Sequence, residues 1–158
     1  MRFRMSLTFS AALVVGLAVQ GAAGTHFRLE IGPPVAAGTD SKMKKAVLVV
    51  RPRLCGDEAS ARITGTAEGV VNGVRQSVSL TFVSLPTPGV HAVQREWSDT
   101  GDWVVHLTGT CPATGATSST IVPVTKTGFV RAKIQVLPRT ATRAQVEAAL
   151  TDFVRSQS

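Results

Sequence analysis

The chain has 158 residues, with 17 basic and 10 acidic side chains that give a formal net charge of +7. This length suits a single domain with a substantial core. The positive charges are scattered, and the densest group, Lys42, Lys44 and Lys45, has no interleaved aromatic residues on which bases would stack. The pattern indicates a solvated loop and argues against nucleic acid as a partner, leaving only a weak attraction to anionic lipid or glycan.

Residues 1–24 are typical of an export signal. Two arginines precede an uncharged apolar run at residues 9–19, and the small residues 21–24 follow as a cleavage site. The alternative is a retained membrane anchor, but only about 15 residues lie between Met5 and the polar Gln20, whereas a spanning helix needs about 20 apolar residues. We therefore expect a secreted or periplasmic protein that begins at Gly24 or Thr25, with no membrane segment after cleavage.

The only two cysteines, Cys55 and Cys111, are expected to form a disulfide. An exported chain enters an oxidising compartment, where an even cysteine count usually means a bridge. The bridge would close a loop of 57 residues, counted from 55 to 111, and stabilise the fold by about 4 kcal/mol. The alternative is a thiol pair for redox chemistry or soft-metal binding, which neither a C-x-x-C spacing nor a flanking histidine supports.

The chain after the signal predicts seven or eight short strands. Residues 27–31 alternate apolar and polar side chains, as in a strand with one buried face, and 46–50 form a continuous valine-rich run that leads to Cys55. Three hairpins follow, with Gly65 and Gly69 as expected bulges or bends in the first. Their strands are 63–71 with 74–85 around Asn72-Gly73, 90–97 with 103–110 around 98–102, and 120–124 with 129–137 around 125–128.

The final stretch, after Pro138, changes to a helical period. Thr142 is the expected N-cap, with Gln145 in the capping-box position three residues later. The apolar side chains lie on one stripe of a 3.6-residue repeat, namely Val146, Ala149, Leu150 and Phe153. We expect Val146, Leu150 and Phe153 to pack on the chain's own sandwich or, as the alternative, on a second protein.

The segment Asp99-Thr100-Gly101-Asp102-Trp103 resembles the Asp-x-Gly-x-Tyr corner that opens strand F of immunoglobulin-like domains. Trp103 replaces the tyrosine, so the usual hydrogen bond of its hydroxyl is not carried over. In such sandwiches strands B and F run the same way in opposite sheets, which would bring Cys55 and Cys111 to one end.

The layout of about residues 26–137 resembles small bacterial secreted or periplasmic immunoglobulin-like proteins. The resemblance implies a mainly β fold, an antiparallel immunoglobulin-like sandwich at 25–138, and a secreted or periplasmic compartment. The helical period adds a C-terminal amphipathic helix and tail at 139–158. The resemblance implies no activity, because function on such sandwiches lies in loops and faces.

The sequence contains no recognisable catalytic motif, and its histidines carry the only chemical hint. Cleavage after Ala23 would place His26 third, where the terminal amine, two amides and the imidazole suit copper(II) or nickel(II). Cleavage one residue later weakens this chelate. His91 and His106 lie on adjacent predicted strands and could face the same surface of the sheet. A direct pair would require a shifted register, so ordinary surface histidines are the simpler interpretation.

Trp97 and Trp103 either pack in the core or expose a platform for sugars, and core packing is commoner in single-domain sandwiches. The leading functional hypothesis is a non-catalytic, exported binding or accessory module of the cell envelope that interacts with another envelope protein. The alternative is a copper-binding accessory protein that uses His26. A carbohydrate-binding module or hydrolase is the third hypothesis.

Overall fold

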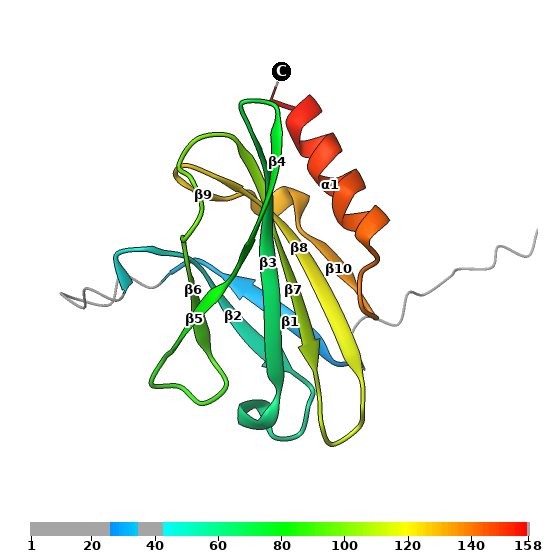
Figure 1. The fold of residues 1–158 in the computed structure, drawn as a ribbon. Helices are drawn as coiled ribbons and strands as arrows, with labels where there is room; N and C mark the ends of the chain where they lie inside the picture. The colour runs from blue at the N-terminus through cyan, green and yellow to red at the C-terminus, as the bar shows by residue number, and fades with distance from the viewer. Residues whose placement is uncertain (1–25, 35–42, 158) are drawn as a thin grey trace, which may run out of the picture.

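The computed structural model describes residues 26–34 and 43–157, which form two antiparallel sheets and a helix (Figure 1). The first sheet has the order β1-β2-β6-β5, from β1 (Arg28–Gly32), β2 (Ala46–Arg53), β5 (Thr81–Ser84) and β6 (His91–Gln94). The second has the order β10-β8-β7-β3-β4, with β9 paired to β8, from β3 (Arg62–Val71), β4 (Val74–Ser79), β7 (Asp102–Thr110), β8 (Thr117–Thr125), β9 (Gly128–Phe129) and β10 (Gln135–Leu137). The 3₁₀ turns η2 (Glu58–Ser60) and η3 (Arg131–Lys133) lie in connections between strands. The predicted signal at 1–24 lies outside the described residues.

The strand order is that of an immunoglobulin sandwich. If β1 to β8 are lettered A, B, C, C′, D, E, F and G, the two sheets have the orders A-B-E-D and G-F-C-C′. The predicted fold class, a mainly β antiparallel immunoglobulin-like sandwich with a C-terminal helix, is confirmed. No helix in the described part of the chain is both long and apolar enough to cross a membrane.

The core lies between the sheets and is built from inward-facing residues of both. The β2 strand enters it through a bulge between Ala46 and Leu48, which lets the consecutive residues Val47 and Leu48 both be buried. The bulge therefore accounts for the two adjacent buried residues in this apolar run, because buried and half-buried residues alternate from Leu48 to Arg53. The largest fully buried side chains of this core are those of Leu29, Leu48, Val50, Val93, Trp103, Val105, Leu107, Val122 and Val124.

The predicted disulfide between Cys55 and Cys111 is present, with the Cα atoms 5.5 Å apart. Cys55 follows β2 in one sheet and Cys111 follows β7 in the other, so the bridge joins the sheets at the end where both strands finish. Both residues are almost fully buried. The cross-link therefore closes that end of the core.

The corner before β7 makes its hydrogen bond with an indole in place of a phenol. Trp103 Nε1 donates to the carbonyl of Thr100 at 2.9 Å, three residues upstream. The indole N–H therefore replaces the missing tyrosine hydroxyl as the donor. The resemblance to the tyrosine corner did not predict this replacement. Gly101 adopts a positive φ of 86° at this corner, where an added Cβ would lie 2.4 Å from the carbonyl oxygen of Val70.

The first and third predicted hairpins are confirmed, and the second is wrong. Asn72 and Gly73 both have positive φ between β3 and β4, as a type I′ turn requires. Strands β8 and β9 also pair, although η3 interrupts the return arm before β10 rejoins β8. In contrast, β6 pairs with β2 and β5, whereas β7 pairs with β3 and β8. The connection between β6 and β7 crosses from one sheet to the other.

Two further details of the first hairpin differ from expectation. The predicted strand 74–85 is divided at Leu80, where the chain leaves the second sheet as β4 and enters the first as β5. Gly65 and Gly69 form no bulge, because β3 pairs with β7 in continuous register from Arg62 to Val70. Each glycine instead makes room for a neighbour. An added Cβ would lie 2.3 Å from the His106 carbonyl oxygen at Gly65 and 2.3 Å from the Trp103 ring at Gly69.

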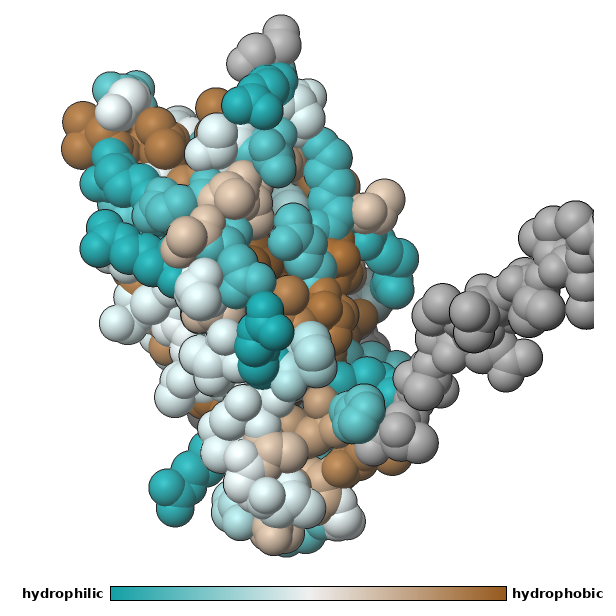
Figure 2. All heavy atoms as spheres, turned by 90° about the vertical axis from the view of Figure 1, so that its right-hand side faces the viewer, coloured by the Kyte–Doolittle hydropathy of each residue, from teal (hydrophilic) through white to brown (hydrophobic). Residues whose placement is uncertain are grey.

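The helix α1 (Arg143–Arg155) packs on the outer face of the second sheet, over β7 and β8. Thr142 and Gln145 form the predicted capping box. The apolar stripe forms a second core with two outward-facing sheet residues, Val104 and Ile121. The stripe residues are Val146, Ala149, Leu150 and Phe153. Viewed from this side, the surface is mainly hydrophilic or neutral, with smaller apolar areas between (Figure 2).

Candidate functional site

A basic pocket of about 680 Å³ opens at the end of the sandwich opposite the disulfide. It lies where β2 begins, where β6 ends and beside the turn between β8 and β9. Five cations and one carboxylate line it, so its formal charge is +5 − 1 = +4. These residues are Lys44, Lys45, Arg95, Lys126, Arg131 and Asp99. Such a surplus of positive charge in a hollow favours an anionic ligand.

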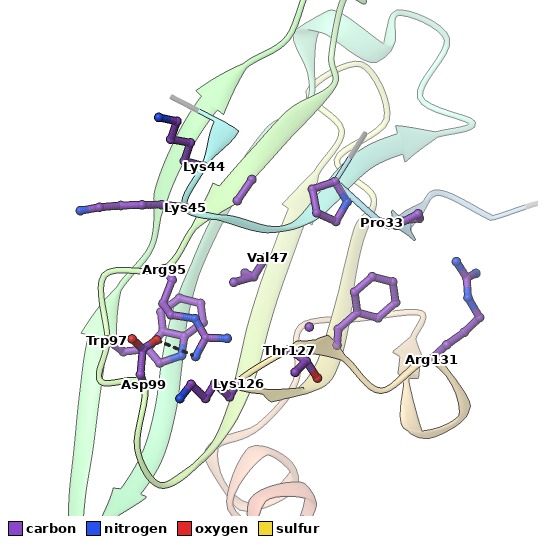
Figure 3. A pocket seen from close by; sticks show the side chains of 14 residues that line it. Pro33, Lys44, Lys45, Val47, Arg95, Trp97, Asp99, Lys126, Thr127 and Arg131 are labelled. Atoms are coloured by element: carbon purple, nitrogen blue, oxygen red, sulfur yellow. Dashed lines mark ion pairs between the residues drawn. The ribbon is translucent and has the colours of Figure 1, made fainter. Parts of the chain in front are cut away.

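Backbone contacts between separate segments bring the cations together. Lys44 and Lys45 immediately precede β2, and the carbonyl of Lys45 accepts a hydrogen bond from the backbone N–H of Arg95 at 2.8 Å. Lys126 occupies the turn after β8, which the Thr125 hydroxyl closes by donating to the carbonyl of Gly128 at 3.0 Å. Figure 3 shows Lys44 and Lys45 on one rim of the pocket and Arg131 on the opposite rim.

Arg95 is the fixed charge of the pocket, since its side chain is only 12% exposed. Its Nη2 donates to the Thr125 carbonyl at 2.6 Å, and its Cζ lies 5.5 Å from the centroid of the Trp97 ring. Its Nη1 lies 3.6 Å from a carboxylate oxygen of Asp99. Figure 3 shows the guanidinium beside the indole and directed at Asp99. A guanidinium held in this way is preorganised for an anion.

Two aromatic side chains, Trp97 and Phe129, belong to the apolar lining of the pocket. Trp97 is 6% exposed and packs against Trp103 with ring centroids 6.1 Å apart, while Phe129 lies 5.6 Å from the Cζ of Arg131. Because both tryptophans are buried in the main core, they form no exposed platform for sugars. Within the described part of the chain, the Trp97 indole N–H is buried and has no hydrogen-bond acceptor.

A second cleft, of about 530 Å³, lies between the outer face of the second sheet and the start of α1. Here Arg75 of β4 donates to Glu147 of the helix through Nη2 and Nε, at 2.7 and 3.2 Å, and also lies 3.1 Å from Glu68 of β3. The hydrogen bond from Arg75 lowers the pKa of Glu147, and the same bond raises the pKa of Arg75. Because the charges of this cluster nearly balance, we interpret it as the tie between helix and sheet.

The three histidines lie apart from the basic pocket. His26 is exposed at the start of the described residues, and the chain before it lies outside them, so the chelate stays a prediction. His91 on β6 and His106 on β7 belong to different sheets, which rules out the two-histidine surface. Burial lowers the pKa of both, and the Glu68 carboxylate partly opposes this for His106. The described residues contain no cluster of three or more potential metal ligands.

Sequence reasoning missed the basic pocket. In the sequence, Lys44 and Lys45 belong to a group that is expected to be solvated. The other cations of the pocket lie about 50 residues (Arg95) and about 80 residues or more (Lys126 and Arg131) further along the chain. The only local signal was the aromatic residue two positions after Arg95. The charged groups of the pocket are four exposed cations, one fixed guanidinium and one exposed carboxylate, a set that is suited to electrostatic recognition of an anion. Comparison with known protein families, curated proteins and solved structures finds no match.

Proposed function

We propose that the protein is a non-catalytic binding module of the cell envelope, which holds an acidic segment of a partner protein in its basic pocket. The observation that carries the proposal is the convergence of five cations around one hollow with a single carboxylate. Electrostatic complementarity of this kind steers an acidic partner and fixes its register. The volume of about 680 Å³ is sufficient for a few side chains of an extended segment.

An exported location is part of the proposal. The disulfide between Cys55 and Cys111 supports it, since such bridges persist in oxidising compartments. The strand order supports the resemblance to small secreted or periplasmic immunoglobulin-like proteins, whose binding surfaces lie in loops and faces. The apolar stripe of α1 is already covered by the sheet, so it does not serve as the partner surface.

The test measures binding of a dye-labelled peptide of alternating glutamate and glycine by fluorescence anisotropy. Lys45→Gln with Lys126→Gln removes two charges from the pocket and should weaken binding about tenfold. The matched control, Arg62→Gln with Arg139→Gln, removes two charges at exposed positions outside the pocket. Equal weakening by both pairs, or no binding by the unaltered protein and its variants, would overturn the proposal.

A further inference from the structure

The two partners of the ion pair in the basic pocket are held very differently. Arg95 is fixed by the Thr125 carbonyl and the Trp97 ring, and its side chain is 12% exposed. Asp99 lies in the connection between β6 and β7, and its side chain is 70% exposed. The cation is therefore part of the framework, whereas the carboxylate stands largely in solvent.

The contact between Arg95 and Asp99 is also far from the best geometry available to a guanidinium. The shortest distance is 3.6 Å, while a charge-assisted hydrogen bond between such groups measures about 2.7–2.9 Å and is often doubled. A carboxylate that enters the pocket from outside is not tethered to the connection between β6 and β7, so it would be free to approach the guanidinium at the favoured distance. Release of Asp99 exposes little additional surface, because most of its side chain already contacts solvent.

From these observations we infer that Asp99 occupies the place of the ligand: it is a built-in competitor that an incoming aspartate or glutamate side chain displaces from Arg95. The inference rests on the proposed function and specifies the group that the pocket recognises. A side-chain carboxylate exchanges one for one with the resident carboxylate, and the rim cations Lys45 and Lys126 then lie beside the rest of the acidic segment.

The contrary interpretation is that Asp99 positions Arg95 for binding. The two interpretations predict opposite effects of Asp99→Asn, which removes the charge at a largely exposed position and should leave the fold intact. A competitor makes binding stronger when it is removed, whereas a positioning residue makes binding weaker. Asp152→Asn is the matched control, since Asp152 is also 70% exposed, pairs with Arg155 at 3.4 Å and lies outside the basic pocket.

The experiment measures the Kd of the labelled glutamate–glycine peptide for the unaltered protein and the two variants at one salt concentration. We expect Asp99→Asn to bind the peptide at least about threefold more tightly than Asp152→Asn does. Because both variants lose one negative charge, this comparison removes the effect of net charge. If the unaltered protein binds the peptide only weakly and Asp99→Asn binds it more tightly, this result would support the inference equally.

An equal or lower affinity of Asp99→Asn than of Asp152→Asn, with the unaltered protein still binding through the pocket, would overturn the inference and leave the proposed function standing. Loss of the proposed function has a different signature. In that case none of the three proteins binds the peptide, or removal of Lys45 and Lys126 has no more effect than removal of charges elsewhere.

Discussion

Gly69 and Trp103 face one another across β3 and β7, with the indole lying over the glycine. An added Cβ at Gly69 would lie 2.3 Å from ring atom Cδ2, so Gly69→Ala has to displace a side chain that is 1% exposed. We expect a loss of about 1–3 kcal/mol in the free energy of unfolding, as for other overpacked cores. Urea unfolding measures it. Gly32→Ala is the control, because nothing lies within 4 Å of its added Cβ; an equal, small loss in both variants would contradict this packing.

His106 should make the fold less stable in mild acid. Burial lowers its pKa in the folded state, so the unfolded chain binds the proton more readily. The stability is then fully present above the unfolded pKa of about 6.5 and is lost as the pH falls from there toward the lower folded value. His106→Gln should therefore reduce the loss of unfolding free energy between about pH 7 and pH 5.

The second histidine whose pKa is lowered by burial, His91, provides the comparison for this experiment. Because burial also lowers the pKa of His91, part of the pH dependence should persist in His106→Gln. A profile that His106→Gln leaves unchanged would contradict the prediction.

The predicted copper binding by His26 would depend on where a signal is cleaved. Only a chain that begins at Gly24 would place His26 third, where it would complete a four-nitrogen set for copper(II). We expect a visible absorption band that is lost in His26→Ala and that strengthens as the pH rises, since chelation releases protons. A chain found by intact mass to begin at Thr25, or a band that survives the substitution, would exclude this chelate.

At the scale of elements, α1 is part of the folded core, so loosening its packing should lower the stability of the whole domain. Phe153 is 2% exposed and packs with Val104 and Ile121 of the second sheet. Phe153→Ala should lower the free energy of unfolding by about 3 kcal/mol or more, the usual effect of truncating a buried aromatic. Thr151→Ala, on the exposed side of the helix, is the control. An unchanged unfolding midpoint for Phe153→Ala would show that the helix leaves the sheet in solution.

The elements that the sequence predicts well are those whose signals are local. The capping box at Thr142, the helical stripe and the Asn72-Gly73 turn each depend on residues a few positions apart, and all are found in place. The connection between β6 and β7 was misjudged because a short polar segment between two strands fits a hairpin and a crossing between sheets equally well. Pairing partners are chosen by the whole core, and the alternation within a strand does not encode them.

At the scale of the whole molecule, the basic pocket was beyond sequence reasoning for a related reason. Its charges come from the start of β2, the end of β6 and the segment around β9, which only the sandwich topology brings to one end. The disulfide could be predicted, because two cysteines leave only one possible pairing. Long-range sites are therefore predictable from sequence when their chemistry is rare, and lysine and arginine are too common to reveal them.

The bridge and the pocket lie at opposite ends of the sandwich, so stability and binding should separate when the bridge is removed. Cys55→Ala with Cys111→Ala frees a loop of 57 residues in the unfolded chain and should lower the free energy of unfolding by about 4 kcal/mol. Under conditions where the double variant remains folded, its affinity for the acidic peptide should equal that of the bridged protein, because Arg95 and Trp97 keep their own contacts. Urea unfolding and anisotropy measure the two quantities on the same sample. A stability that does not change would contradict the loop argument, and an affinity that falls in the folded variant would show that the bridge shapes the distant pocket.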